Sequence, residues 1–365
     1  MKEKISLNDV VRHFSPAWYA SVMGTGGLAN VLYMLSGKMA FLKPLSVIIF
    51  WLNVILFLLL VGPWTARWFL HFDKLKDDLR HPVMSNFFVT MPVGGLILGT
   101  NFFIIGKDFF NMSFVVFLGT ILWAYGVLLA LIFGVFVTYN MMLMDEVSPE
   151  LTNNSWYITP VASIVIPLLG NQLVKAYAKK SIGVAQIVNL TDIVFFGIGL
   201  FLFIILSSII LNRFINHKMP HAMATPTFWI ILGPIGVGTL SLMGIADASK
   251  LVGLITTTDS LKMLSLILWG FGIWAFVLTI AITVKYLREG GIPFSLSWWA
   301  FIFPLSAYTL SSFNVYMYVK LQIVYWYTLL LAALLIVLWI STFIKSLVGT
   351  FNGKLLVPQE PKNKK

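Results

Sequence analysis

The chain has 365 residues, of which 59% are hydrophobic and only 11% are charged. Soluble domains carry roughly 25% charged residues, so this composition excludes a water-soluble protein and indicates a polytopic membrane protein. The sequence contains no cysteine, which excludes disulfides, thiolate metal sites and thiol chemistry.

Ten apolar segments follow one another along the chain, and each is long enough to cross a bilayer, for which about 20 apolar residues suffice. They begin near residues 15, 44, 83, 114, 156, 190, 226, 263, 298 and 323. They predict one transmembrane domain, residues 1–351, followed by a short, polar and basic C-terminal tail, residues 352–365. The first segment is a full span with no small-residue cleavage site after it, so we expect no cleavable signal peptide.

The odd-numbered segments contain about twice as many Gly and Pro residues as the even-numbered ones. Such residues are tolerated in membrane helices where neighbouring helices or cavity water satisfy the backbone. We therefore expect an all-α fold with ten transmembrane helices, arranged as five helical hairpins around a central pore. The odd-numbered helices are expected to line that pore.

The net charge of +11 is distributed unevenly between the two ends of the predicted bundle. The termini and even-numbered loops carry 16 Lys and Arg residues, and the odd-numbered loops carry 9. By the positive-inside rule, this bias predicts that both termini are cytoplasmic. We expect a multi-pass protein of the plasma or cell inner membrane. One loop opposes the bias, because it contains Asp145, Glu146 and Glu150 without any Lys or Arg. The basic residues are explained by topology, so we expect no nucleic-acid partner.

Four odd-numbered segments share aromatic residues followed within a few positions by proline. Proline removes a backbone donor and clashes with the preceding turn, so each helix is expected to kink there. The alternative is that such kinks and interfacial aromatic residues are ordinary in membrane helices. The proposed kinks that line the pore are Pro92, Pro160, Pro234 and Pro304.

Ionisable side chains are absent between the ends of the odd-numbered segments. The one candidate in any span is Asp192, which we expect near the end of the sixth helix, at the interface or as a helix cap. We therefore predict a weakly binding pore, since conduction requires that an ion can leave. The predicted pore-lining small or polar residues are Gly24, Gly27, Gly94, Gly95, Ser163, Gly236 and Ser306, and further interior polar residues include Asn30, Asn101, Asn171, Gln172 and Asn314.

Catalysis is disfavoured by the same pattern. The spans contain no acid–base pair, no metal-ligand cluster and no activated nucleophile, so we expect neither an enzyme nor a metal or cofactor site. Tight carboxylate capture is also disfavoured, because the interior offers no Arg for bidentate pairing.

Two motifs resemble the fingerprints of a known family. HPVMSNFF opens the third segment at residues 81–88, and FSLSWWAFIFPLS opens the ninth at residues 294–306. Together they resemble the tellurite-resistance/dicarboxylate transporter family, which includes the plant slow anion channel, a bacterial tellurite-resistance channel and fungal malate permeases and sulfite pumps. Residues 14–29 and 226–242 are most similar to the malate-permease and archaeal–bacterial branch. The similarity covers all ten segments.

The resemblance implies a homotrimer in the lipid bilayer, with one conduit per protomer and small anions as cargo. It also implies that a Phe just before the Pro of the ninth helix plugs the pore, which here is Phe303. The leading hypothesis is thus passive or weakly coupled transport of inorganic anions or organic acids through a Phe-gated pore. The alternatives are a proton-coupled C4-dicarboxylate transporter of the malate type, or sulfite or tellurite efflux.

Overall fold

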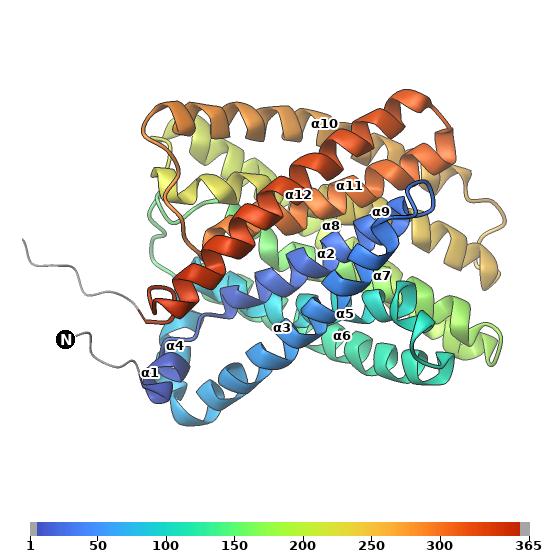
Figure 1. Cartoon of the computed structure of the whole chain (residues 1–365), viewed down its shortest axis with the longest axis horizontal. Helices are drawn as coiled ribbons and strands as arrows, with labels where there is room; N and C mark the ends of the chain where they lie inside the picture. Colours follow the sequence, from blue (N-terminus) through green and yellow to red (C-terminus); the bar gives the residue numbers. More distant parts are fainter. Residues whose placement is uncertain (1–5, 358–365) are drawn as a thin grey trace, which may run out of the picture.

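The computed structural model describes residues 6–357, and within that range every regular element is helical. Both ends of the described chain lie at the same end of the helical bundle (Figure 1). The predicted C-terminal tail falls mostly on residues 358–365, which lie outside the described residues, and residues 352–357 form turns.

Five long helices are each preceded by a short 3₁₀ segment. These inner helices, with their 3₁₀ segments, are α2 (Tyr19–Leu35, after Pro16–Trp18), α5 (Thr90–Ile104, after Met84–Val89), α7 (Ile158–Tyr177, after Asn154–Tyr157), α9 (Leu232–Leu251, after Ala222–Ile231) and α11 (Trp299–Val319, after Leu296–Trp298). They alternate along the chain with five longer, uninterrupted outer helices, which are α3 (Leu42–Leu70), α6 (Met112–Met142), α8 (Ile182–Asn216), α10 (Asp259–Arg288) and α12 (Gln322–Phe351).

The two sets differ sharply in burial. In α5, α7 and α9 with their 3₁₀ segments, 78–89% of the most apolar stretch is buried, whereas the outer helices reach only 17–33%. The outer helices leave aliphatic surfaces exposed, as is expected of helices that face a membrane. Across residues 6–357, eight helices are long and apolar enough to span a membrane, and the chain is a multi-pass membrane protein.

The remaining two inner helices, α2 and α11, are too short or too polar to be counted among those eight helices. Protein encloses them as it encloses the other inner helices. α2 has only 17 residues, and α11 carries several Ser, Thr and Tyr side chains. Most residues of both helices are buried against other helices. A helix that is shielded from lipid in this way does not need an apolar surface.

The inner helices contact one another in a closed cycle. In the order of the ring, α2 packs on α5, α5 on α7, α7 on α9, α9 on α11 and α11 on α2. Each inner helix also packs on the outer helix that follows it in the chain. In Figure 1, α10 lies along the upper edge of the molecule and α6 along the lower edge, and α12, α11, α2 and α3 cross between them.

Small residues allow neighbouring inner helices to approach closely. A Cβ at Gly236 of α9 would lie 2.5 Å from the backbone nitrogen of Tyr308 and 2.6 Å from the backbone carbon of Ala307, both on α11. Gly27 of α2 faces the hydroxyl of Ser306 on α11 in the same way. Such contacts are typical of membrane helices that associate through small residues.

Buried or half-buried tryptophans connect inner helices to outer helices by hydrogen bonds. Each indole N–H donates to a Ser or Thr hydroxyl, which satisfies a donor that would otherwise be costly to bury in a membrane protein. The donors and acceptors are Trp229 to Thr283 (2.9 Å), Trp269 to Ser312 (2.9 Å), Trp299 to Ser346 (3.1 Å) and Trp339 to Thr25 (3.1 Å).

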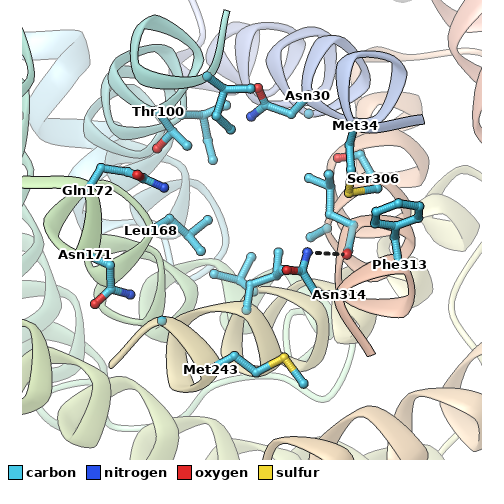
Figure 2. Close-up of a pocket in the computed structure, with 18 of the residues that line it drawn as sticks. Asn30, Met34, Thr100, Leu168, Asn171, Gln172, Met243, Ser306, Phe313 and Asn314 are labelled. Atoms are coloured by element: carbon cyan, nitrogen blue, oxygen red, sulfur yellow. Dashed lines mark hydrogen bonds between the residues drawn. The ribbon is translucent and has the colours of Figure 1, made fainter. Parts of the chain in front are cut away.

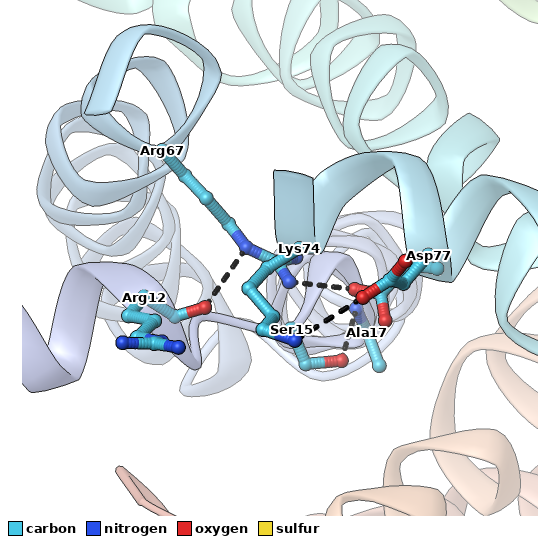
Figure 3. Close-up of polar contacts among 7 residues, drawn as sticks. Arg12, Ser15, Ala17, Arg67, Lys74 and Asp77 are labelled. Carbon is cyan, nitrogen blue, oxygen red and sulfur yellow. Dashed lines mark hydrogen bonds and ion pairs between the residues drawn. The ribbon is translucent and has the colours of Figure 1, made fainter. Parts of the chain in front are cut away.

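Two short helices at the end of the bundle that holds the chain termini are held by one arginine (Figure 3). Arg67 of α3 is 4% exposed, pairs with Asp78 at 2.7 Å and donates from Nε to the backbone oxygen of Arg12 at 3.2 Å. It thereby joins α3 to α4 (Phe72–Arg80) and to α1 (Leu7–Arg12). α4 lies within a connection that was expected to be a loop, although its amphipathic sequence and buried Leu75 are helical features.

The sixth long helix, α8, begins at Ile182, about eight residues earlier than expected. Its first turns carry polar residues that contact α9, with Gln186 donating to the backbone oxygen of Val252 and Asn189 to the hydroxyl of Ser249. In the sequence these polar residues suggest a loop, because the groups that satisfy their hydrogen bonds are at least 60 residues away in the chain. As a result, Asp192 is the eleventh residue of the helix.

Candidate functional site

A cavity of about 410 Å³ lies at the centre of the ring, in the half of the bundle opposite the chain termini. All five inner helices contribute to its lining. Figure 2 shows polar side chains from several of these helices arranged around an open centre. The main polar residues of the wall are Asn30 of α2, Thr100 of α5, Asn171 and Gln172 of α7, and Ser306 and Asn314 of α11.

Hydrogen bonds fix several of these side chains. Asn101 donates to Oδ1 of Asn30 at 2.8 Å and to the backbone oxygen of Gly26 at 2.9 Å, and it accepts from Asn53 of α3 at 3.0 Å. Asn314 donates to the backbone oxygen of Leu310 at 2.9 Å (Figure 2). Asn53, Asn101 and Asn30 therefore form a buried chain of amides from the outer helix α3 to the cavity wall.

The hydroxyl groups in the wall are not free donors. Thr100 donates to the backbone oxygen of Leu96, and Ser306 donates to that of Phe303, each on its own helix. Gln172 differs, because its amide has no hydrogen-bond partner among residues 6–357, although the side chain lines the cavity. Gln172 therefore presents unpaired amide N–H groups to the cavity.

Charged side chains occur only at the mouth of the cavity, near the C-terminal ends of two inner helices. Lys175 of α7 and Asp247 of α9 line this region, and Asp247 pairs with Lys262 at 2.8 Å. The one phenol in the lining is that of Tyr33, near the C-terminal end of α2, and deeper in the cavity the lining carries no ionisable side chain. In the described part of the chain, no cluster of His, Asp or Glu has the composition of a metal site.

Phe303 separates this cavity from a second, much smaller one. The smaller cavity has a volume of about 50 Å³ and is lined by the N-terminal parts of the inner helices and by their 3₁₀ segments. Of the described residues, Phe303 alone lines both cavities, and its side chain is 5% exposed. The smaller cavity is almost entirely apolar, and its wall includes Met23, Ile158, Val161, Ile230 and Ala300.

The four prolines occupy two kinds of position. Pro92, Pro160 and Pro234 are each the third residue of an inner α-helix, directly after a 3₁₀ segment. Proline is well accommodated in a first turn, where its missing N–H has little consequence. Pro304 is the sixth residue of α11 and lines the smaller cavity. The bends expected at these positions stay predictions.

The seven predicted small or polar residues are also placed in two ways. Gly27 and Ser306 line the larger cavity. The others lie in contacts outside the two central cavities: Gly24 and Gly236 face α11, Gly94 faces α2, Gly95 faces side chains of α3 and α6, and Ser163 is buried. Among the lining residues that sequence reasoning did not single out are Thr100, Leu168 and Met243, whose apolar or mildly polar character gives no signal of their direction.

Asp192 does not cap α8, whose N-cap residue is Ser181, so the expectation of a capping role is wrong. Its side chain is fully buried, and its Oδ1 accepts a hydrogen bond from the indole of Trp123 at 3.0 Å. Both carboxyl oxygens lie against Gly170 of α7, and Oδ2 has no partner in the described residues. The residue after Gly170 is Asn171, which lines the central cavity.

The closed ring of buried helices, the apolar outer helices and the internal polar cavity define a multi-pass membrane transport protein. Comparison with known proteins identifies the family. The family model described as "SLAC1: Voltage-dependent anion channel" matches residues 13–347. This chain belongs to that family, which confirms the predicted relationship.

Several curated proteins resemble this chain over most of its length. An uncharacterised transporter of Methanocaldococcus jannaschii is 36% identical over 95% of this chain and 96% of its own. A sulfite efflux pump of Arthroderma benhamiae is 28% identical over 82% and 80%, respectively. A malic acid transport protein of Schizosaccharomyces pombe is 20% identical over 82% and 70%. These relatives are transporters, in agreement with the prediction that this chain is not an enzyme.

Proposed function

We propose that this protein conducts small anions across the membrane through the ring of inner helices, passively or with weak coupling. In this proposal all ten long helices span the bilayer as five hairpins, α2 and α11 included, and both termini are cytoplasmic. The observation that carries the proposal is the pair of cavities on either side of Phe303, both enclosed by the same five helices.

Anions are favoured as cargo by the chemistry of the wall and mouth. The free amide of Gln172 and the ammonium group of Lys175 are donors without a competing acid beside them in the cavity, since Asp247 already pairs with Lys262. The absence of a fixed charge deeper in the wall favours weak binding and fast release. Relatives named for malic acid and sulfite transport support a small mono- or dianion, either organic or inorganic.

Phe303 is proposed as the gate. A ring that fills the boundary between a wide polar cavity and a narrow apolar one can stop ions by steric closure and by dewetting. Opening then requires only that the side chain of Phe303 swings aside, because the smaller cavity is already bounded by small or flexible residues such as Ala300 and Met23.

The proposed activity can be tested by flux measurements in proteoliposomes of purified protein. Malate, sulfite or chloride is placed on one side, and the potential is clamped with a potassium ionophore. We expect anion efflux that follows the membrane potential and persists without a pH gradient, with no potassium flux in the absence of the ionophore. Equal permeation of cations and anions, or no flux above protein-free liposomes, would overturn the proposal.

The proton-coupled alternative has one specific residue in its favour. Asp192 has a buried carboxyl group that lies against Gly170 of the inner helix α7, and the residue after Gly170 is the cavity-lining Asn171. Intramembrane carboxyl groups mark proton relays in many transporters. If malate uptake requires a proton gradient, and Asp192→Asn removes that requirement, the coupled carrier replaces the passive conduit as the better account.

We also propose that the protein assembles as a homotrimer in which each protomer has its own conduit. The outer helices leave broad aliphatic surfaces exposed, which lipid or neighbouring protomers can cover. Native mass spectrometry of protein released from nanodiscs measures the mass directly. A predominant species of three chains is expected, and a stable monomer would contradict this part of the proposal. Tellurite efflux is a further candidate activity, to be tested with tellurite in the same flux assay.

A further inference from the structure

A second polar cavity, of about 400 Å³, lies beside the mouth of the central one. It is formed by the end of α5, the start of α6 and the end of α7, and four lysines line it. We call it the lysine basin, defined by Lys107, Lys175, Lys179 and Lys180. The lysine basin and the central cavity share Gln172 and Lys175 in their walls, so they are adjacent and connected through these two side chains.

No acidic side chain lines the lysine basin. Asp108, which directly follows Lys107 in the chain, pairs with Lys43 at 3.2 Å and accepts a hydrogen bond from Tyr33 at 3.5 Å. Within residues 6–357, the four basin lysines take part in no ion pair. Four like charges around one cavity raise its positive potential and attract counter-ions.

The positive-inside rule accounts for the excess of basic residues at the end that holds the chain termini, but it does not account for these four lysines. Lys175, Lys179 and Lys180 fall within six residues at the end of the bundle opposite the chain termini. The distribution of Lys and Arg predicts that this end is non-cytoplasmic, where the positive-inside rule disfavours clusters of basic residues. A second reason for their position is therefore required, and anion binding supplies one.

The floor of the basin gives it a defined shape. Phe103 of α5 and Val116 of α6 are both 8% exposed and form an apolar base beneath the lysine side chains. Ser113 contributes a hydroxyl at the rim. Lysine is a compact, mobile point charge, so several lysines over an apolar floor can surround a small anion without the fixed geometry that an arginine fork imposes.

We propose that the lysine basin is a capture site for small dianions, dicarboxylates or divalent oxyanions, which pass from it to the central cavity past Gln172 and Lys175. This inference rests on the proposed anion transport and adds a substrate class to it. A dianion gains more than a monoanion from several separate cations at similar distances, since Coulomb energy scales with the product of the charges. The site therefore favours divalent over monovalent cargo at low concentration.

A binding experiment tests the site without relying on transport. The full-length protein in phosphatidylcholine nanodiscs is acetylated with an amine-reactive ester, and each lysine is quantified by mass spectrometry. Malate or sulfate, compared with chloride at equal ionic strength, is expected to slow acetylation of Lys107, Lys179 and Lys180 severalfold. Lys38 and Lys250 lie at the same end but outside the basin, and they should react unchanged. Uniform protection, or none, would overturn the proposal.

A lipid phosphate has the same chemistry as a free dianion, so a second arm distinguishes the two sources. The labelling is repeated in nanodiscs that contain phosphatidic acid. If this lipid protects the basin lysines and malate does not protect them in phosphatidylcholine, the occupant is a headgroup and the capture site for cargo is refuted. Protection by malate in phosphatidylcholine supports the proposal whatever the lipid does.

Matched charge variants connect binding to transport. Lys179→Gln/Lys180→Gln and Lys38→Gln/Lys250→Gln each remove two positive charges from the same end of the molecule. We expect the first pair to raise the KM for malate about fivefold, as for two solvent-exposed charge contacts, with Vmax and chloride flux nearly unchanged. The second pair should leave the KM unchanged.

Two other outcomes are informative. Equal KM shifts in both variants would mean that the general field of this end acts on the anion, and the basin as a specific site would be refuted. If malate protects the basin lysines but the wild-type protein transports no malate, the binding site is supported and the proposed transport function is refuted.

Discussion

Substitution of Gly236 by Ala is expected to destabilise the protein by forcing two inner helices apart. The new Cβ would lie 2.5–2.7 Å from backbone atoms of Ala307 and Tyr308 on α11, whereas ordinary contacts begin near 3.4 Å. These are main-chain atoms and cannot rotate away, so α9 and α11 must separate by nearly an ångström. Overpacking of this kind costs about 1–3 kcal/mol.

The matched control is Gly270→Ala on α10, where no atom lies within 4 Å of the new Cβ. In a helix interior the same change normally gains up to about 1 kcal/mol, because Gly is a poor helix former. Gly236 also lies within a helix, so this gain applies to both variants and the two should differ by the overpacking cost of about 1–3 kcal/mol. Unfolding in mixed detergent and SDS, followed by tryptophan fluorescence, measures this difference. If Gly236→Ala is as stable as Gly270→Ala, the close approach of α9 and α11 is refuted.

Three further substitutions test polar contacts. Asp78→Asn should lower the stability of the protein by about 2–3 kcal/mol, because it leaves the buried guanidinium of Arg67 without its carboxylate. Amide hydrogen exchange in α1 should then become faster. Unchanged exchange would contradict the anchoring role of Arg67. Asp192→Asn should stay within about 1 kcal/mol of wild type in the same unfolding assay, since an amide oxygen still accepts from Trp123; a large loss would imply that the negative charge itself is needed. Asn101→Leu should lower the stability by about 2–4 kcal/mol, because it leaves the buried amides of Asn53 and Asn30 without this hydrogen-bond partner. An unchanged stability would show that the chain of amides does not stabilise the fold.

The contrast between the two kinds of segment was readable from the sequence because burial in a membrane protein changes composition. Helices that face lipid must be regular and aliphatic, as α8 and α12 are, whereas enclosed helices can carry Gly, Pro, Ser and Asn. That difference predicted which helices are buried by protein. The family motifs at residues 81–88 and 294–306 predicted the relationship that the comparisons confirm.

The sequence did not predict which individual side chains point into the central cavity. Gly27 lines the central cavity while Gly24, one turn earlier, packs on α11, and both are buried glycines of one helix. Which of them faces the axis depends on the rotation of α2 within the ring, and this is set by tertiary contacts. The same limit applied to Asp192, whose partner Trp123 is 69 residues away, so local sequence suggested an interfacial or capping role.

The lysine-rich loops illustrate a different limit. Counting charges by side treats Lys107 and Lys180 as independent contributions to topology. Only the fold shows that they line one cavity from two separate loops, next to the mouth of the central cavity. Convergence of distant residues therefore had to come from the structure.

The central claim is that Phe303 closes the conduit, and planar-bilayer recording of Phe303→Ala tests it most directly. Phe313→Ala is the matched control, because Phe313 lies on the same helix and lines the larger cavity but not the smaller one. In asymmetric chloride or malate we expect small currents from wild type and Phe313→Ala. We expect at least tenfold larger currents from Phe303→Ala, equivalent to about 1.4 kcal/mol of barrier, with an anion-selective reversal potential. Currents from Phe303→Ala no larger than those of Phe313→Ala would contradict the account.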